Sequence, residues 1–252
     1  MTYFEFLIRF LLTPILILSI ATRRYWNTSF WAAVLIHVFL AVAYTTPWDN
    51  YLVSTQVWFY NSKLVTGILL GFVPIEEYTF FVLQTILSGL WWLFLSERLS
   101  NPENFKPVIA TRSIAIFVMF IIWIFFMFLF FNGNRHFTYL SIILFWALPA
   151  MILQMFFGGD ILWHHRRLVA LAILIPATYL SLTDIVALRA TTWSISPSQT
   201  TGILIFGILP IEEILFFFVT AILIVFGMTL LLSDESKQRF SSWKSRNFKG
   251  IP

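Results

Sequence analysis

The chain has 252 residues, of which 59% are hydrophobic, 19% aromatic and only 11% charged, and its net charge is +4. Soluble proteins carry about 25% charged residues, so this composition cannot cover a water-facing surface and excludes a soluble globular protein. The lack of cysteine excludes disulfide bonds, thiolate metal sites and thiol catalysis. We therefore expect an integral membrane protein.

Seven apolar segments are each long enough to cross about 30 Å of hydrocarbon as a helix. In chain order they are residues 3–21, 30–46, 68–95, 111–131, 137–157, 168–184 and 203–232. The first segment has no basic stretch before it and no small-residue cleavage site after it, so we interpret it as a retained anchor. The sequence thus predicts an all-α, polytopic membrane protein with seven transmembrane helices.

Basic residues are distributed unevenly between the two sets of loops. Only Lys63, Arg135 and Arg189 follow even-numbered segments. Twelve follow odd-numbered segments: Arg23, Arg24, Arg98, Lys106, Arg112, Arg166, Arg167, Lys237, Arg239, Lys244, Arg246 and Lys249. The positive-inside rule then predicts a multi-pass protein of the cell membrane with its N-terminus outside and its C-terminus in the cytoplasm. Because topology explains the basic excess, we do not expect nucleic-acid binding.

An internal repeat organises the chain. A shift of 135 residues superposes Pro14 on Pro149, Asp49 on Asp184 and Trp58 on Trp193, and one inserted residue then aligns VPIEE with LPIEE. The predicted units are two parallel three-helix repeats at residues 3–96 and 138–232, a linker with the fourth helix at 97–137, and a basic cytoplasmic tail at 233–252. The fourth helix restores the orientation of the second copy, so a site is expected between the halves.

The second helix of each repeat is expected to be short. It spans roughly 16 residues and ends at Asp49 in TTPWDN or at Asp184 in SLTD. A polar loop with Trp58 or Trp193 follows. Short or interrupted segments at corresponding positions of two halves indicate a binding site within the membrane.

Two motifs, VPIEEYTFF at 73–81 and LPIEEILFF at 209–217, contain four of the twelve acidic residues: Glu76, Glu77, Glu212 and Glu213. A carboxylate beside a helix N-terminus gains about 0.3–1 kcal/mol from the helix dipole, so these residues could simply begin helices at the outer interface. The doubling argues against this interpretation, because one acid per helix would suffice and adjacent like charges repel.

Each motif helix has a polar face. On a helical wheel Glu77, Gln84 and Ser88 lie together, and Glu213 and Thr220 repeat the pattern. A charge facing lipid at the helix centre costs about 2.5–3.5 kcal/mol, so the two faces should meet between the repeats. Four clustered carboxyl groups in a dry site cannot all be ionised, and the cluster should therefore offer an acid and a base together.

Aromatic side chains flank these acids: Trp48, Trp58, Phe72, Tyr78, Phe80, Phe81, Trp193, Phe216, Phe217 and Phe218. They pack helices or face lipid, or they stabilise a carbocation through their ring faces by about 0.5–2 kcal/mol each. The four histidines show no metal-ligand spacing, and the sequence contains no DxxxD diphosphate motif and no dinucleotide-binding glycine motif. We expect neither a metal nor a cofactor.

TTPWDN, GFVPIEEYTFFVLQT and its echo GILPIEEILFFF, set in seven helices and two copies, resemble the flavin-independent, integral-membrane lycopene cyclases of the heterodimeric or fused type. The chain is similar to the fused, single-chain form over nearly its whole length. The resemblance implies an intramolecular lyase or isomerase that takes lycopene, or a related linear carotenoid, from the lipid phase. Proton-initiated carbocation cyclisation would close β-ionone rings without net redox, giving γ- or β-carotene. It also implies other carotenoid-pathway enzymes as partners.

The family's PxEE acids map onto Glu76, Glu77, Glu212 and Glu213, and its PWD aspartate maps onto Asp49, all implied to be catalytic. The implied substrate-binding residues are Trp48, Trp58, Tyr78, Phe80, Phe81, Gln84, Asp184, Trp193, Phe216 and Phe217. The second copy departs from the first, because SLTD replaces TPWD, Ile214 replaces Tyr78 and Thr220 replaces Gln84. Its acids are therefore expected to play a supporting role.

A proton-coupled transporter built from a parallel repeat is the alternative, since repeats and intramembrane acids are typical of transporters too. Transport would need a polar pathway through both leaflets, whereas the inner halves of the third and seventh segments are almost wholly apolar. A retinal photoreceptor is a weaker alternative still, because the seventh helix has no lysine between Thr201 and Ser233 to form a Schiff base.

Overall fold

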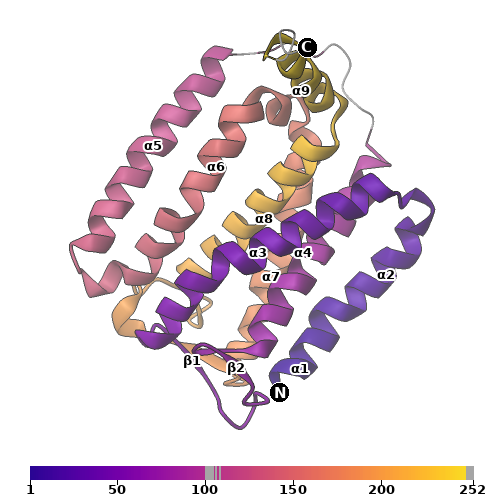
Figure 1. The fold of residues 1–252 in the computed structure, drawn as a ribbon. Coiled ribbons are helices and arrows are strands. Elements are labelled where there is room, and N and C mark those ends of the chain that lie inside the picture. Colours follow the sequence, from indigo (N-terminus) through magenta and orange to yellow (C-terminus); the bar gives the residue numbers. More distant parts are fainter. Residues whose placement is uncertain (100–104, 106, 108, 248–252) are drawn as a thin grey trace.

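A computed structural model describes residues 1–99, 105, 107 and 109–247 (Figure 1). Within this described part, seven helices are long and apolar enough to cross a membrane, which confirms the predicted number. The first span, Tyr3–Tyr25, combines α1 (Tyr3–Phe6), the π-helix η1 (Leu7–Leu12), α2 (Thr13–Thr22) and the 3₁₀-helix η2 (Arg23–Tyr25). The other spans are formed by α3 (Thr28–Ser54), α4 (Ile75–Ser96), α5 (Ile109–Phe131), α6 (Thr138–His164, after η3 at Arg135–Phe137), α7 (Arg166–Arg189) and α8 (Ile211–Leu232).

The second helix of each repeat is longer than predicted. α3 has 27 residues and continues through Pro47 and Asp49 to Ser54, and α7 has 24 residues and passes Asp184. The prediction failed because a polar, proline-containing stretch was interpreted as a helix end. In the structure such side chains bond back to their own helix, as Asn50 does when its Nδ2 donates to the Thr46 carbonyl at 2.9 Å. Both aspartates are therefore held on rigid helix rather than on loops.

The third and seventh helices begin later than the apolar runs suggest. α4 starts at Ile75 and α8 at Ile211, with Pro74 and Pro210 as their N-caps. The preceding residues form two short hairpins, β2 (Leu69–Leu70) with β3 (Val73–Pro74) and β5 (Leu204–Ile205) with β6 (Leu209–Pro210). The second hairpin turn is one residue longer than the first, so the inserted residue of the repeat lies in this turn.

The two copies are joined by a small antiparallel ladder. Strand β1 (Trp58–Tyr60) pairs with β4 (Trp193–Ile195), with Phe59 opposite Ser194, and the 3₁₀-helix η4 (Pro197–Gln199) follows β4. Because β1 and β4 come from corresponding loops, both copies place these loops at the same end of the bundle, as a parallel repeat requires. Figure 1 shows β1 and β2 at the end of the bundle opposite α9 (Asp234–Asn247).

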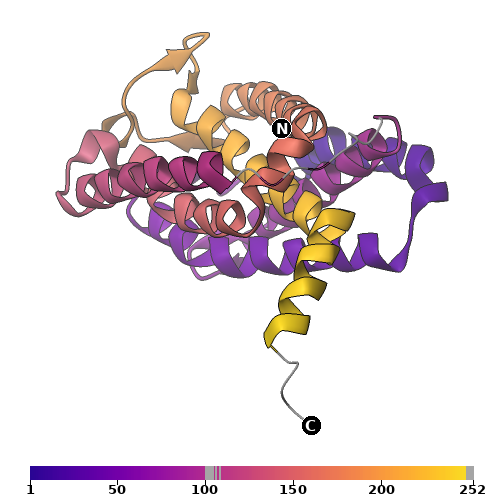
Figure 2. The same cartoon turned by 90° about the horizontal axis from the view of Figure 1, so that it is seen from above.

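The motif helices form the centre of the molecule. More than half of the residues of α4 and of α8 are buried, and the two helices contact each other. Gln84 on α4 donates to Thr220 on α8 at 2.7 Å, so the predicted polar faces do meet. By contrast, the span Arg112–Phe131 of α5 has no buried residue and packs along α6 at one edge of the bundle (Figures 1 and 2).

The predicted basic tail forms helix α9 over Asp234–Asn247 and projects away from the bundle in Figure 2. Arg239 anchors this helix, because its guanidinium donates to both carboxylate oxygens of Asp160 at 2.9 and 2.6 Å. Lys106 and Lys249, which entered the topology prediction, lie outside the described residues, as do the last five residues of the chain.

Candidate active site

A small, deeply buried cavity of about 30 Å³ lies between the two repeats, near the loop end of the bundle. One glutamate from each motif helix faces it, Glu77 from α4 and Glu213 from α8, together with Asp184 from α7. Its remaining lining is aromatic: Tyr3, Trp58, Tyr60, Phe80, Trp193, Phe216 and Phe217. The site therefore combines carboxyl groups and ring faces among side chains that are mostly buried.

Tyrosine hydroxyls fix the two glutamates. Tyr3 and Tyr60 donate to the same oxygen, Oε2, of Glu77 at 2.5 and 2.9 Å, whereas Glu213 accepts one such bond, from Tyr139 to Oε1 at 2.6 Å. Tyr60 lies in the loop outside the spans. Its burial and, to a smaller extent, the charge of the nearby Glu77 raise the pKa of its hydroxyl well above the usual value, so the hydroxyl keeps its proton. Because donated hydrogen bonds favour a charged carboxylate, Glu77 is the better stabilised as an anion.

The asymmetry between the glutamates has a source in the repeat. Tyr3 and Tyr139 are counterparts, and each bonds the motif glutamate of its own copy. Tyr60 has Ile195 as its counterpart on strand β4, and an isoleucine has no hydroxyl to donate. The second tyrosine donor therefore exists only for Glu77.

The other two motif glutamates have a different environment. Glu76 and Glu212 are completely buried, and their Oε1 atoms accept hydrogen bonds from the backbone amides of Thr66 and Thr201, each at 2.6 Å. These bonds tie the hairpin loops to the starts of α4 and α8. The expected cluster of four glutamates is thus divided, because neighbouring helix positions point in directions about 100° apart.

Both aspartates join the central group instead. Asp184 accepts a hydrogen bond from Trp193 Nε1 at 2.8 Å. Asp49 is completely buried, and its charge would repel that of Glu77. Neither oxygen of Asp49 has a hydrogen-bond partner among the described residues. The described residues also provide no ion pair to these carboxyl groups, so ionising all of them together would be very costly.

A larger cavity of about 460 Å³ lies beside the small one, with walls from α3, α4, α6 and α8. Phe216 lines both cavities. The larger one reaches the bundle surface, because its lining residues Leu40, Tyr44 and Leu153 are exposed. In a membrane this surface would face lipid, which gives an apolar ligand a route toward the carboxyl groups.

Aromatic rings connect the two cavities. Trp146, which lines the larger cavity, lies 5.1 Å from Trp48 between ring centroids, and Trp48 lies 5.8 Å from Phe216. Trp58 contacts the same Phe216 at 5.9 Å. These separations are within the usual range for aromatic contacts, so the path is packed rather than open.

The sequence-predicted binding residues are distributed over the two cavities. The small cavity is lined by Trp58, Phe80, Asp184, Trp193 and Phe217, the large one by Phe81 and Gln84, and both by Phe216. Trp48 lies between them through its ring contacts. Tyr78 differs from the expectation, because its hydroxyl donates to the Leu70 carbonyl and so holds the β2–β3 hairpin.

Three tyrosines of the site, Tyr3, Tyr60 and Tyr139, were not predicted. Thr2-Tyr3 recurs as Thr138-Tyr139, but at an offset of 136 rather than 135 residues. The interval from Tyr3 to Pro14 contains the π-helical segment η1, and a π-bulge accommodates one extra residue in a helix. A repeat search that allowed a second single-residue shift would have paired them.

Comparisons with known proteins agree on one family. The model of the family described as lycopene cyclase matches the chain twice, over residues 2–97 and 136–231. The chain is 36% identical to "Lycopene beta-cyclase" of Halobacterium salinarum, covering 91% of this chain and 95% of that protein. It is 34% identical to "Bifunctional lycopene cyclase/phytoene synthase" of Phaeosphaeria nodorum, covering 87% of this chain and 39% of that protein, and 33% identical to the bifunctional protein of Gibberella fujikuroi. No solved structure is significantly similar to it.

Proposed function

The chain belongs to the lycopene cyclase family, and we propose that it converts the linear ends of lycopene into β-ionone rings without net redox, giving γ- and β-carotene. The observation that carries this proposal is the pair of buried glutamates, Glu77 and Glu213, in a small cavity that shares Phe216 with the apolar cavity reaching the lipid-facing surface. The name of the Halobacterium relative, lycopene beta-cyclase, supports the β ring.

The proposed reaction needs one acid and one base. Glu213 gives a proton to the terminal double bond of lycopene, the next double bond attacks the resulting cation to close the six-membered ring, and a proton from a neighbouring ring carbon passes to Glu77. One C–H bond forms and one breaks, so the product is an isomer of the substrate. The hydrogen-bond pattern supports this assignment, because Glu77 receives two tyrosine donors and Glu213 one.

The proton must return from Glu77 to Glu213 before a second ring can close. Asp184 lines the same cavity as both glutamates, and we assign this relay to it. Asp49 and Trp193 support the relay as neighbours of Glu77 and Asp184 respectively. The carboxyl groups of Glu76 and Glu212 position the two motif helices by capping the hairpin loops.

The aromatic lining suits a cationic intermediate. A ring face attracts a cation by about 0.5–2 kcal/mol, most strongly where water is excluded. Phe80, Phe216, Phe217 and Trp58 line the small cavity, so a cation formed there lies against ring faces as well as beside the carboxyl groups. The rings thereby favour ring closure over capture of the cation by water.

The large cavity would hold the polyene next to the reacting end. Its volume of about 460 Å³ lies within the usual range for small-molecule sites, and its lining is mainly apolar. The same cavity is unsuited to proton-coupled transport of a polar solute, because it opens sideways to the lipid-facing surface through Leu40, Tyr44 and Leu153.

The excess of basic residues on one side supports a placement in the cell membrane with the loop end outside and α9 in the cytoplasm. The fusion of a lycopene cyclase with a phytoene synthase, as named in the fungal relatives, supports other carotenoid-pathway enzymes as partners.

The test is expression of the chain in a host that accumulates lycopene, followed by chromatographic identification of the pigments. We expect lycopene to be replaced by γ- and β-carotene, and the host to turn from red to orange. A Glu77→Gln, Glu213→Gln double variant that inserts normally provides the control and should leave lycopene unchanged. An unchanged carotenoid profile with well-inserted wild-type protein would reject the proposal and favour a transporter.

A further inference from the structure

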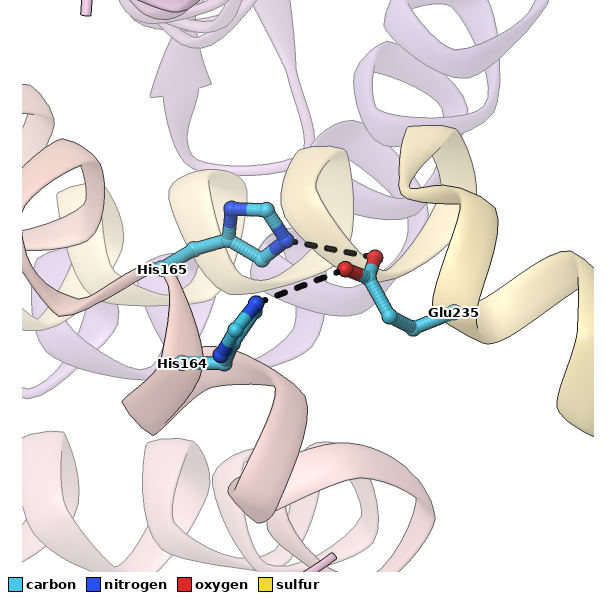
Figure 3. A group of neighbouring side chains, drawn as sticks. All are labelled: His164, His165 and Glu235. Carbon is cyan, nitrogen blue, oxygen red and sulfur yellow. Dashed lines mark hydrogen bonds and ion pairs between the residues drawn. The ribbon is translucent and has the colours of Figure 1, made fainter. Parts of the chain in front are cut away.

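Two histidines and a glutamate meet at the end of the bundle opposite the proposed active site. His164 ends α6, His165 connects α6 to α7, and Glu235 lies in the first turn of α9. Figure 3 shows both imidazoles pointing at the carboxylate of Glu235 from different sides. Nε2 of His165 lies 3.2 Å from Oε2, and Nε2 of His164 lies 3.7 Å from Oε1.

These separations match those between the ligands of a small divalent cation. Zn²⁺ binds imidazole nitrogen and carboxylate oxygen at about 2.0–2.2 Å, so two ligands at a tetrahedral angle are roughly 3.3–3.6 Å apart. The observed 3.2 and 3.7 Å, measured to the two different oxygens of Glu235, lie just below and just above this range. With one ligand atom taken from each residue, the three atoms lie within 4.8 Å of one another. The imidazole planes are nearly perpendicular, at 85°, so the two nitrogens approach from different directions.

The donor set indicates the class of metal. Two imidazole nitrogens and one carboxylate suit Zn²⁺ and its neighbours among the transition metals, whereas Ca²⁺ and Mg²⁺ prefer oxygen ligands throughout. The three residues are also largely shielded, with side-chain exposures of 12% for His164, 9% for His165 and 19% for Glu235. A fourth coordination position would be filled by water or by an external ligand.

An independent contact prepares the site. Arg239, one turn further along α9 than Glu235, binds Asp160 near the end of α6 with both of its terminal nitrogens, and Arg112 lies 3.9 Å from the same carboxylate. Docking of α9 therefore does not depend on the histidines. Lys237, two residues after Glu235 on α9, forms its ion pair with Asp234, at 2.8 Å.

We propose that His164, His165 and Glu235 form a Zn²⁺ site that fastens the tail helix α9 to the α6–α7 turn. The paired glutamates lie in the first turns of α4 and α8, next to the hairpins, whereas Glu235 begins α9 at the opposite end of the bundle (Figure 1), so the site is structural rather than part of the cyclisation chemistry. It stands independently of the proposed function, since it involves none of the residues assigned to that reaction. Without a metal, Glu235 would instead form an ion pair with one protonated histidine.

The test uses the full-length chain, purified in detergent with a tag that contains no histidine. Zn²⁺ is titrated by calorimetry, and Co²⁺ is titrated in parallel because its absorption spectrum reports coordination geometry. We expect one Zn²⁺ per chain, a tetrahedral Co²⁺ spectrum, and little response to Mg²⁺ or Ca²⁺. Slower hydrogen exchange of the α9 amides with Zn²⁺ would show that the metal fastens the helix.

Matched variants distinguish Zn²⁺ binding at this site from adventitious binding elsewhere on the protein. Glu235→Gln and His165→Ala should weaken Zn²⁺ binding at least about tenfold, since loss of an outer-shell partner alone costs 10–100-fold. Asp234→Asn and His136→Ala remove an exposed carboxylate and an exposed histidine, and should bind Zn²⁺ as the wild type does. Absence of Zn²⁺ binding by the folded wild type, or equal binding by Glu235→Gln, would overturn the proposal and leave the ion pair.

Discussion

The hydroxyl of Tyr139 gives the most direct test of the proposed acid. Tyr139 donates to Glu213 at 2.6 Å in a fully buried setting. If Glu213 loses a proton in the transition state, this bond changes from a neutral one, contributing about 0.5–1.5 kcal/mol, to a charged one, contributing about 1.5–3 kcal/mol. The difference, about 1–1.5 kcal/mol, is stabilisation that the transition state gains over the ground state.

We therefore expect Tyr139→Phe to slow ring closure about 5- to 13-fold, since each 1.36 kcal/mol changes a rate tenfold. The assay is single-turnover conversion of lycopene by membranes that contain equal amounts of inserted protein. Tyr179→Phe is the matched control, because the Tyr179 hydroxyl also donates a hydrogen bond, but to the Phe10 carbonyl at 2.9 Å, away from the carboxyl groups. Its single-turnover rate should stay near that of the wild type.

A wild-type single-turnover rate for Tyr139→Phe, or an equal loss of rate in the Tyr179→Phe control, would refute the reasoning.

Three further outcomes are expected. Glu77→Gln or Glu213→Gln should abolish ring formation while the protein still inserts, and normal carotenoid products from both would rule out acid–base catalysis by this pair. Glu212→Ala should instead mainly lower thermal stability, by about 1–3 kcal/mol, because the Thr201 amide loses its buried acceptor; melting curves measure this effect. In heavy water, one turnover of unlabelled lycopene should add one mass unit per ring, because the proton gained comes from an exchangeable acid; product of unchanged mass would contradict this. Gly227→Ala should lower the melting temperature, because the new Cβ would clash with His37 Nε2, and adding His37→Ala should restore it; a double variant as unstable as the single one would show that this contact is not the cause.

Much of the fold could be predicted because it depends on local chemistry. Apolar length predicts membrane spans, and the paired VPIEE and LPIEE motifs indicate a duplication whatever the packing. The seven spans and the central position of the motif helices followed from these features. Helix ends did not follow, since the polar stretch around Pro47 and Asp49 is held in α3 by burial and by back-bonding side chains such as Asn50.

The sequence by itself determined that paired glutamates occupy equivalent helix starts, but only the tertiary structure decided which of each pair faces the centre. Adjacent helix positions point about 100° apart. Glu76 therefore accepts a hydrogen bond from the Thr66 backbone amide, whereas Glu77 accepts one from the Tyr3 hydroxyl. Tyr3 lies 74 positions from Glu77 along the chain, so only packing of the first helix against α4 brings them together. The same holds for Glu235 and the two histidines, because distances along the sequence carry no information about contacts between helices until the bundle has formed.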